Sequence, residues 1–217
     1  MLNGIFAVNK PKGPSSFAII HQIRKLTGEK RIGHAGTLDP LASGVLVVAV
    51  GRENTKKIND FVKKEKEYLA TVKFGFTSAT DDEEGEKTEI KFSRNIPMLE
   101  EIESVCQKFI GNIQQIPPIF SAIKINGQKS YDLARKNKAV EMKPRDVFIK
   151  EIKIEKYSWP FLQIKVVCGP GVYIRSLSKD IGAELGVGGY MADLVRTRVG
   201  EFILENALNL DELVKND

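Results

Sequence analysis

Hydrophobic positions along the chain recur with the periods of both helices and strands. Apolar residues three and four positions apart predict four helices, over Ser15 to Leu26, Glu53 to Val62, Pro97 to Phe109 and Val172 to Leu185. The first has a serine pair at its start and Gly28 just beyond its end, the residue types that cap helices. A further basic helix is expected from about Ser130 to Lys138.

Strands are predicted by alternation and by short apolar runs. Alternate apolar residues from Tyr68 to Phe76 predict a strand with one buried face, and residues 44–50 predict a fully buried one. Two more are expected at 146–156 and 161–168, and Asn126-Gly127 predicts a hairpin turn. The pattern indicates an α+β (mixed α/β) chain with one catalytic domain over residues 1–217.

Composition excludes several classes. The longest apolar run, Val45 to Val50, is too short to cross a bilayer, and the amino terminus lacks the pattern of a secretory signal, so a cytoplasmic location is expected. Cys106, Cys168 and the two histidines form no cluster with metal-ligand spacing. We therefore expect no metal.

Positive charge is unevenly placed along a chain whose net charge is +5. Residues 1–66 hold 12 Lys and Arg against 5 Asp and Glu, and residues 119–150 hold 8 against 3. Clustered cations favour a phosphate-bearing partner, because they replace the counterions of phosphates. Charge alone is equally compatible with solvated surface lysines.

A glycine-rich loop from Gly33 to Gly44 carries the strongest candidate for chemistry. It contains one acid, Asp39, followed by Pro40, which restrains the residue before it to extended backbone. An Asp-Pro pair is more often an ordinary turn. The alternative is a carboxylate presented as a nucleophile.

The residues Gly33-His34-Ala35-Gly36-Thr37-Leu38-Asp39-Pro40-Leu41-Ala42-Ser43-Gly44 resemble the signature of tRNA pseudouridine-55 synthases of the TruB type. Other blocks resemble the same family in the same order: Lys10-Pro11-Lys12-Gly13, Lys66-Glu67-Tyr68, Gln115-Ile116-Pro117-Pro118, Tyr131-Leu133-Ala134-Arg135 and Gly171-Val172-Tyr173-Ile174-Arg175. The resemblance covers roughly residues 4–203. It implies the pseudouridine synthase fold, with a mixed, mainly antiparallel central sheet flanked by helices and a basic cleft.

The resemblance also implies an activity, the isomerisation of uridine to pseudouridine in the T-loop of tRNA, at position 55. Asp39 matches the family's nucleophile, and the sequence leaves open whether the carboxylate attacks the base or the sugar. Tyr68 matches an active-site tyrosine that packs on the base and assists proton removal from C5. Arg175 matches an arginine that pairs with the catalytic aspartate. Taken singly, Tyr68 is more often a strand-end aromatic and Arg175 a surface ion pair.

Further residues are expected to bind substrate. By the same matching, His34 is expected to contact the flipped-out nucleotide region, and Tyr173 and Leu194 to line the pocket. Lys10, Lys12 and Lys124 are expected to contact phosphates, the last within a basic flap at about 119–146. The implied partner is the T-arm stem-loop of tRNA. The protein is expected to be a monomer and not to bind a membrane. No cofactor is expected, because the isomerisation changes neither oxidation state nor atom count.

The chain departs from the family pattern at several places. Phe120 stands where a tyrosine is usual, Val195 where an arginine is common, and Ala79 where an aspartate is typical. The carboxy-terminal RNA-binding domain (PUA-type) of longer members is expected to be missing. The alternative function is a module of the same fold that binds or folds tRNA without chemistry. Glycoside hydrolysis is set aside, because no second carboxylate stands in a comparable motif.

Overall fold

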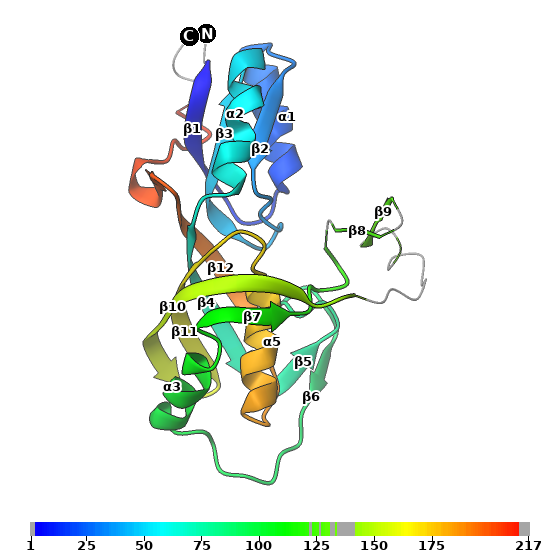
Figure 1. Cartoon of the computed structure of the whole chain (residues 1–217), viewed down its shortest axis with the longest axis vertical. Coiled ribbons are helices and arrows are strands. Elements are labelled where there is room, and N and C mark those ends of the chain that lie inside the picture. Colours follow the sequence, from blue (N-terminus) through cyan, green and yellow to red (C-terminus); the bar gives the residue numbers. More distant parts are fainter. Residues whose placement is uncertain (1–2, 122, 126, 131–132, 134–141, 213–217) are drawn as a thin grey trace. The chain divides into compact units, whose positions relative to one another are not determined.

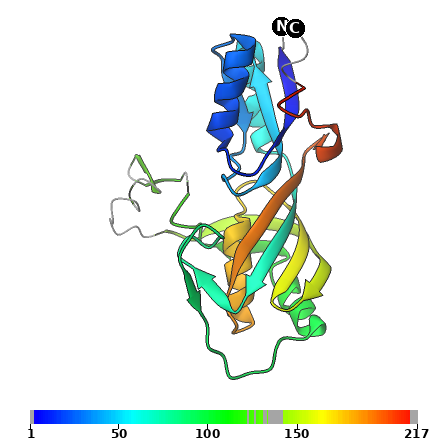
Figure 2. The ribbon, with the colours of Figure 1, turned by 180° about the vertical axis from the view of Figure 1, so that it is seen from behind.

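A computed structural model describes residues 3–121, 123–125, 127–130, 133 and 142–212 (Figures 1 and 2). The helices are α1 (Ser16–Thr27), α2 (Arg52–Val62), α3 (Leu99–Gln107), α5 (Ile174–Glu184) and the 3-10 helix η1 (Leu204–Asn206). The strands are β1 (Gly4–Lys10), β2 (Ile32–Ala35), β3 (Ser43–Val50), β4 (Lys66–Phe74), β5 (Phe76–Ser78), β6 (Lys87–Glu89), β7 (Gly111–Gln115), β8 (Lys124–Ile125), β9 (Gln128–Lys129), β10 (Arg145–Ser158), β11 (Phe161–Cys168), β12 (Gly189–Val199) and β13 (Phe202–Ile203).

The chain groups into two compact units. The first unit comprises Met1–Leu69, Val166–Pro170 and Leu194–Asp217, and the second comprises Ala70–Lys165 and Gly171–Asp193. The strands β12, β4 and β11 are neighbours in that order, and each runs from one unit into the other. The prediction of a single catalytic domain therefore stays a prediction.

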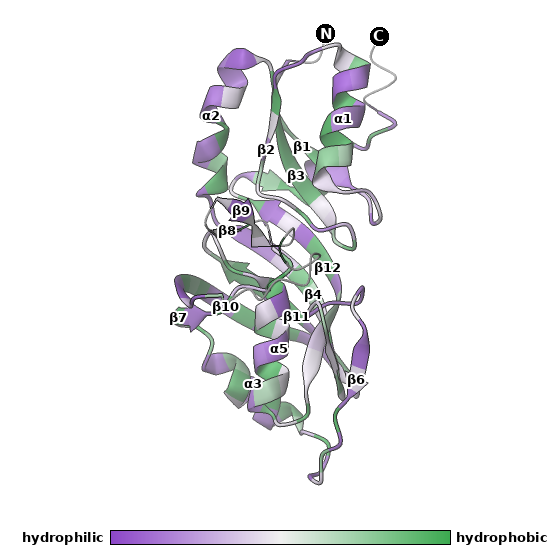
Figure 3. Cartoon of the chain, turned by 90° about the vertical axis from the view of Figure 1, so that its right-hand side faces the viewer, coloured by the Kyte–Doolittle hydropathy of each residue, from purple (hydrophilic) through white to green (hydrophobic). Residues whose placement is uncertain are grey.

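The first unit is built around β3, which is buried from Gly44 to Val50. Strand β1 pairs with it antiparallel, as does β2, whereas β12 pairs with it parallel, so the sheet is mixed. Side chains alternate between the faces of a strand. On one face Leu46 and Val48 pack with α1, and on the other Val45 and Val47 pack with residues that include Ile58 and Phe61 of α2. The apolar faces of α1 and α2 turn toward the strands between them (Figure 3).

The sequence predicted α1 and its caps correctly but not all of its buried face. The backbone N–H of Ala18 donates to Ser15 Oγ at 3.1 Å, and Gly28 ends the helix in the left-handed conformation. The apolar positions that predict this helix are Phe17, Ile20, Ile23 and Leu26. Of these, Phe17 and Leu26 are 67% and 38% exposed. Ile20 and Ile23 are buried as the pattern predicts, and Ser16 and Ile19 are buried beside them.

The second unit combines β7 and β10, which pair antiparallel, with the β5–β6 pair and the helices α3 and α5. The expected strands at 146–156 and 161–168 are confirmed as β10 and β11. The strand expected to reach Phe76 ends at Phe74, because Gly75 has a φ of +86° and turns the chain into β5. The basic helix expected at 130–138 lies mostly outside the described residues.

The chain has mixed α+β secondary structure, as expected. Within the described ranges, no helix has both the length and the apolar character that a membrane crossing requires.

Candidate active site

In the first unit, the loop that carries Asp39 is held by hydrogen bonds on both sides of the acid. The hydroxyl of Ser16, at the start of α1, donates to the Leu38 carbonyl and accepts from the Leu38 N–H, each at 2.8 Å. The N–H of Gly13 donates to the Pro40 carbonyl at 2.8 Å. The residues immediately before and after Asp39 are thus fixed to a helix end and to the basic turn at residues 10–14.

Lys10 provides a second anchor for the same loop. Its side chain is buried, and its ammonium donates to the carbonyl oxygens of Ala42 at 2.6 Å and Pro11 at 3.0 Å. Burial lowers the pKa of Lys10 to about 8, while the charge of Asp39 acts in the opposite direction. Lys10 was expected to contact an RNA phosphate, whereas here its ammonium is directed at the loop carbonyls.

Arg196, on β12, bridges the two ends of the loop. Its side chain is buried, Nε donates to the Val45 carbonyl at 2.7 Å, and Nη2 donates to the Gly36 carbonyl at 3.0 Å. The backbone of Arg196 also pairs with Gly44. A Cβ at Gly44 would lie 2.2 Å from the Arg196 carbonyl oxygen, so only glycine fits there.

Tyr68, on β4, is buried beside the same guanidinium. Burial raises the pKa of Tyr68, and the Asp39 carboxylate raises it further. The charge of Arg196 and its hydrogen bond to the tyrosine lower the pKa. The first unit therefore brings the predicted nucleophile and the predicted tyrosine together around Arg196.

Three more residues of the first unit bear on this site. His34, on β2, is half-buried and hydrogen-bonds the backbone of Gly36, and burial together with Arg196 lowers the pKa of its imidazole. Leu194 is buried on β12. Lys66 is buried and donates to the carbonyls of Val62 at 2.7 Å and Lys64 at 2.6 Å, and burial lowers its pKa to about 8. The RNA contact expected of His34 and the place of Leu194 in the pocket wall stay predictions.

Arg175 lies in the second unit, in the first turn of α5, and its side chain is buried. Nη1 is 3.3 Å from Asp82 Oδ2, and Nη2 donates to the Phe120 carbonyl at 2.8 Å. Asp82 is itself buried and accepts from the Thr80 hydroxyl and from the Glu84 N–H. The pairing of Arg175 with Asp39 stays a prediction.

Tyr173 is fixed through its backbone. Gln115, buried at the end of β7, donates to the Tyr173 carbonyl at 3.1 Å and accepts from the Tyr173 N–H at 2.8 Å. The hydroxyl of Ser176 donates to the Ile116 carbonyl at 2.7 Å. The start of α5, where Tyr173 and Arg175 stand, is thereby tied to the segment after β7.

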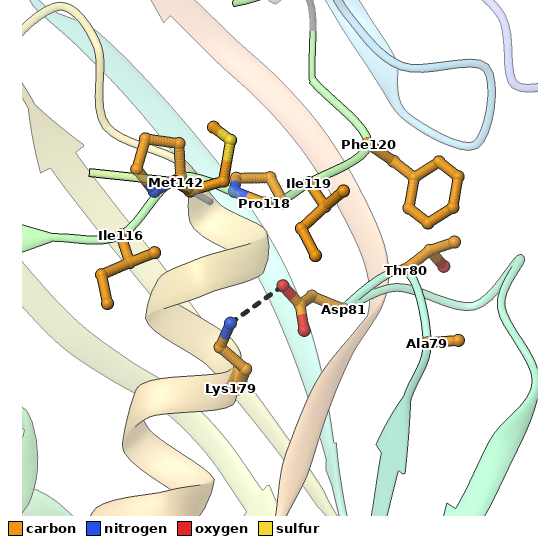
Figure 4. Close-up of a pocket in the computed structure, with 10 residues that line it drawn as sticks. Ala79, Thr80, Asp81, Ile116, Pro118, Ile119, Phe120, Met142 and Lys179 are labelled. Carbon is orange, nitrogen blue, oxygen red and sulfur yellow. Dashed lines mark hydrogen bonds and ion pairs between the residues drawn. The ribbon is translucent and has the colours of Figure 1, made fainter. Parts of the chain in front are cut away.

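A pocket of about 360 Å³ lies next to Arg175 in the second unit (Figure 4). Its lining is Ala79, Thr80, Asp81, Ile116, Pro117, Pro118, Ile119, Phe120, Met142 and Lys179. Lys179 of α5 pairs with Asp81 at 3.0 Å on its wall. The carbonyls of Thr80 and Phe120 accept hydrogen bonds from Arg175. Most of the lining side chains are apolar.

Two further predicted phosphate contacts are Lys12 and Lys124. Lys12 is exposed on the basic turn, as a phosphate contact requires. Lys124 lies in β8, which pairs with β9, and much of the flap at 119–146 lies outside the described residues. The part of the chain that the structure describes contains no cluster of three or more metal-ligating side chains.

Asp82 and Arg196 were not singled out from the sequence. Asp82 stands in an acidic run from Asp81 to Glu86, and Arg196 stands near the end of the region that resembles the family. The residue type alone does not tell whether a charged side chain is exposed or buried. Only the fold shows that both side chains are buried and hydrogen-bonded.

Sequence comparison connects this arrangement to known enzymes. Residues 24–174 match the family described as TruB family pseudouridylate synthase (N terminal domain), and residues 175–216 match tRNA pseudouridylate synthase B C-terminal domain. A tRNA pseudouridine synthase B of Protochlamydia amoebophila is 43% identical over 98% of this chain and 80% of its own length. One from Parabacteroides distasonis is 42% identical over 96% of this chain and 91% of its own.

Solved structures support the same family assignment as the sequence comparison. The chain matches a crystal structure of a Cbf5-Nop10-Gar1 complex with a TM-score of 0.76 and 30% identity, over 97% of this chain and 53% of the other. It matches an H/ACA RNP bound to a substrate RNA containing 2'-deoxyuridine with a TM-score of 0.72 and 28% identity, over 97% and 52%. The chain spans about half the length of these two proteins. The family profile, the relatives and the fold agree, and the chain belongs to the TruB family of pseudouridylate synthases.

Proposed function

We propose that this enzyme isomerises uridine to pseudouridine in the T-loop of tRNA, at position 55, with Asp39 as the nucleophile. Two relatives that match most of the chain are named tRNA pseudouridine synthase B. The observation that carries the proposal is the restraint of the Asp39 loop, whose neighbours Leu38 and Pro40 are both fixed by hydrogen bonds. A nucleophile held in this way loses little freedom when it reacts.

The reaction replaces the bond from C1' to N1 by a bond from C1' to C5. It therefore needs a group that holds the ribose or the base while neither bond is present. The Asp39 carboxylate attacks either the sugar or the base, and the C1'–N1 bond breaks. The base then turns, C5 forms a bond to C1', and the bond to Asp39 breaks, which regenerates the carboxylate. The C5 proton is lost and N1 gains a proton. Atoms and electrons balance without an oxidant, a reductant or an energy donor.

Tyr68 is proposed to act on the same nucleoside. Its ring packs against the target base, and its oxygen assists removal of the C5 proton. The role is supported by the electrostatic interaction between the two side chains, because the carboxylate of Asp39 raises the pKa of Tyr68. Arg175 is proposed to orient Asp39, a role to which its rigid start of α5, held by Ser176 and Gln115, is suited.

The substrate must present an unstacked uridine, because C5 and C6 are out of reach within a stack. Loop nucleotides are the least costly to unstack, which favours a T-loop over a helical stem. His34, Tyr173 and Leu194 are proposed to surround the flipped nucleotide. Lys12 and Lys124 are proposed to contact the RNA phosphates. The enzyme is proposed to bind the RNA as a monomer.

A T-arm stem-loop labelled with tritium at uridine C5 tests the proposal. Incubation with the enzyme should release tritium to water from the loop uridine, because C5 loses its hydrogen as pseudouridine forms. A matched stem-loop with cytidine at position 55 and label in its other uridines should release none. Equal release from both would refute the position, and no release from either would favour a module that only binds or folds tRNA.

A further inference from the structure

Arg196 makes two hydrogen bonds across the loop that carries Asp39, and its own position on β12 is far from that loop in sequence. Its acceptors, the carbonyls of Gly36 and Val45, stand three residues before and six residues after Asp39. The side chain is 1% exposed and is among the largest fully buried side chains of the described residues. A buried arginine is retained only where its donors are used, because burying its charge is costly.

The backbone of Arg196 is fixed to the same loop. Val195 and Arg196 pair in parallel with Ser43 and Gly44, and Gly44 has a φ of +102°. The space that a Cβ would take at Gly44 is filled by the Arg196 backbone. The backbone from which the guanidinium projects is therefore paired with the end of the loop.

The same guanidinium hydrogen-bonds Tyr68. Its charge acts on titratable groups of four strands, which are Lys10 of β1, His34 of β2, Lys66 and Tyr68 of β4, and Cys168 of β11. Arg196 lowers the pKa of Lys10, Lys66 and His34. It is thus a fixed positive charge at the centre of this cluster.

We propose that Arg196 is a positioning residue that holds the Tyr68 hydroxyl in register with the Asp39 loop, so that nucleophile and proton acceptor address the same uridine. The proposal rests on the proposed function. One planar group donates to both loop ends and to the tyrosine, which a lysine cannot do, because an ammonium lacks the guanidinium's extended fork. The charge of Arg196 also favours the ionised form of Tyr68, which is the form that can accept the C5 proton.

Arg196→Lys is the informative variant, because it keeps the charge and removes the fork. Arg198→Lys is the matched control on the same strand, since Arg198 pairs with Glu65 at 2.7 Å and is not placed at the loop. Both proteins are compared with the unaltered enzyme under single-turnover conditions on the T-arm stem-loop. The affinity for RNA and the thermal midpoint are measured alongside. A third measurement is the isotope effect when the target uridine carries deuterium at C5.

We expect Arg196→Lys to slow the single-turnover rate about 100-fold, the usual consequence of a misplacement of about 1 Å. The RNA affinity should stay within about twofold and the isotope effect should be no smaller than that of the unaltered enzyme, because the slowed step is proton removal. Arg198→Lys should react at the unaltered rate. Arg196→Met, which also removes the charge, should be slower still.

Three results would overturn the inference: a folded Arg196→Lys enzyme that reacts within about threefold of the unaltered rate, a loss of RNA affinity as large as the loss of rate, or loss of the isotope effect. If Arg196→Met does not fold, Arg196→Lys alone decides. The proposed function fails separately, since in that case the unaltered enzyme itself releases no tritium.

Discussion

The ammonium nitrogen of Lys10 lies 2.6 Å from the carbonyl oxygen of Ala42, three residues after Asp39. A buried cation thus fixes the loop that presents the candidate nucleophile, and the Ser16 hydroxyl fixes it on the other side of the acid. Lys10 and Lys12 stand two residues apart and differ in what they do. Lys10 is buried under the loop, whereas Lys12 is exposed on the basic turn.

Replacing Lys10 by methionine should slow the reaction. The apolar side chain fills the space but cannot donate to the Ala42 carbonyl, so the Asp39 loop loses an anchor. We expect the single-turnover rate to fall roughly 10- to 100-fold, with RNA affinity little changed. Lys12→Met should do the reverse, weakening RNA binding and leaving the rate at saturating RNA unchanged. Identical behaviour of the two variants would contradict the distinction.

Lys10 should also make stability depend on pH. Its folded pKa of about 8 is below its ordinary value of 10.5, so between these values the unfolded chain binds a proton that the folded chain does not. Stability from this group therefore rises as the pH increases from about 8 to 10.5. The unfolding free energy of the unaltered enzyme minus that of Lys10→Met, measured by urea titration, should grow across this window. A difference that is flat or falls would show that burial does not depress this pKa.

Gly44 should tolerate no side chain. Gly44→Ala forces an alanine to a φ of +102° and places its Cβ 2.2 Å from the Arg196 carbonyl oxygen. Gly111→Ala is a matched control, because Gly111 has a φ of +100° and open space around its Cβ position. Both share the strain of a positive φ, about 1–2 kcal/mol. Only Gly44→Ala adds a clash of roughly 1–3 kcal/mol. Equal loss of stability in urea would contradict the close approach.

The buried pair of Arg175 and Asp82 should separate stability from catalysis. Asp82→Asn removes a carboxylate 3.3 Å from a buried guanidinium, which should lower the unfolding free energy by about 3 kcal/mol or more. Replacing both residues, with Asp82→Leu and Arg175→Met, should recover much of that stability. Tritium release should stay low, because Arg175 is proposed to orient Asp39. Recovery of activity together with stability would mean that the pair is only structural.

The sequence predicted the regular elements well where periodicity was strong. The caps of α1, the buried strand β3 and the strands β10 and β11 are confirmed. Strands β1, β2, β7 and β12 were missed, since their short or mixed patterns depend on neighbours that are distant in sequence. Phe17 shows a further limit, because an apolar residue at a helix end can be exposed although Ile20 and Ile23 of the same pattern are buried.

The candidate site was predicted from the glycine-rich loop at residues 33–44 and its resemblance to the family signature. The structure adds the hydrogen bonds that hold this loop in place. That Asp39 and Tyr68 stand close could not be derived from spacing, because β4 brings Tyr68 to the loop only in the folded sheet. The roles of Arg196 and Asp82 depend on burial, which charge patterns do not report. Lys10 was expected at the surface for the same reason.

The measurement that tests the account most directly compares the unaltered enzyme with Asp39→Asn on a tRNA transcript labelled with tritium at uridine C5. Both proteins are first shown to be folded and to bind the transcript equally. We expect tritium release by the unaltered enzyme and none by Asp39→Asn, because an amide is not a nucleophile for this step. Release by Asp39→Asn at the unaltered rate would contradict the role of Asp39 as the nucleophile.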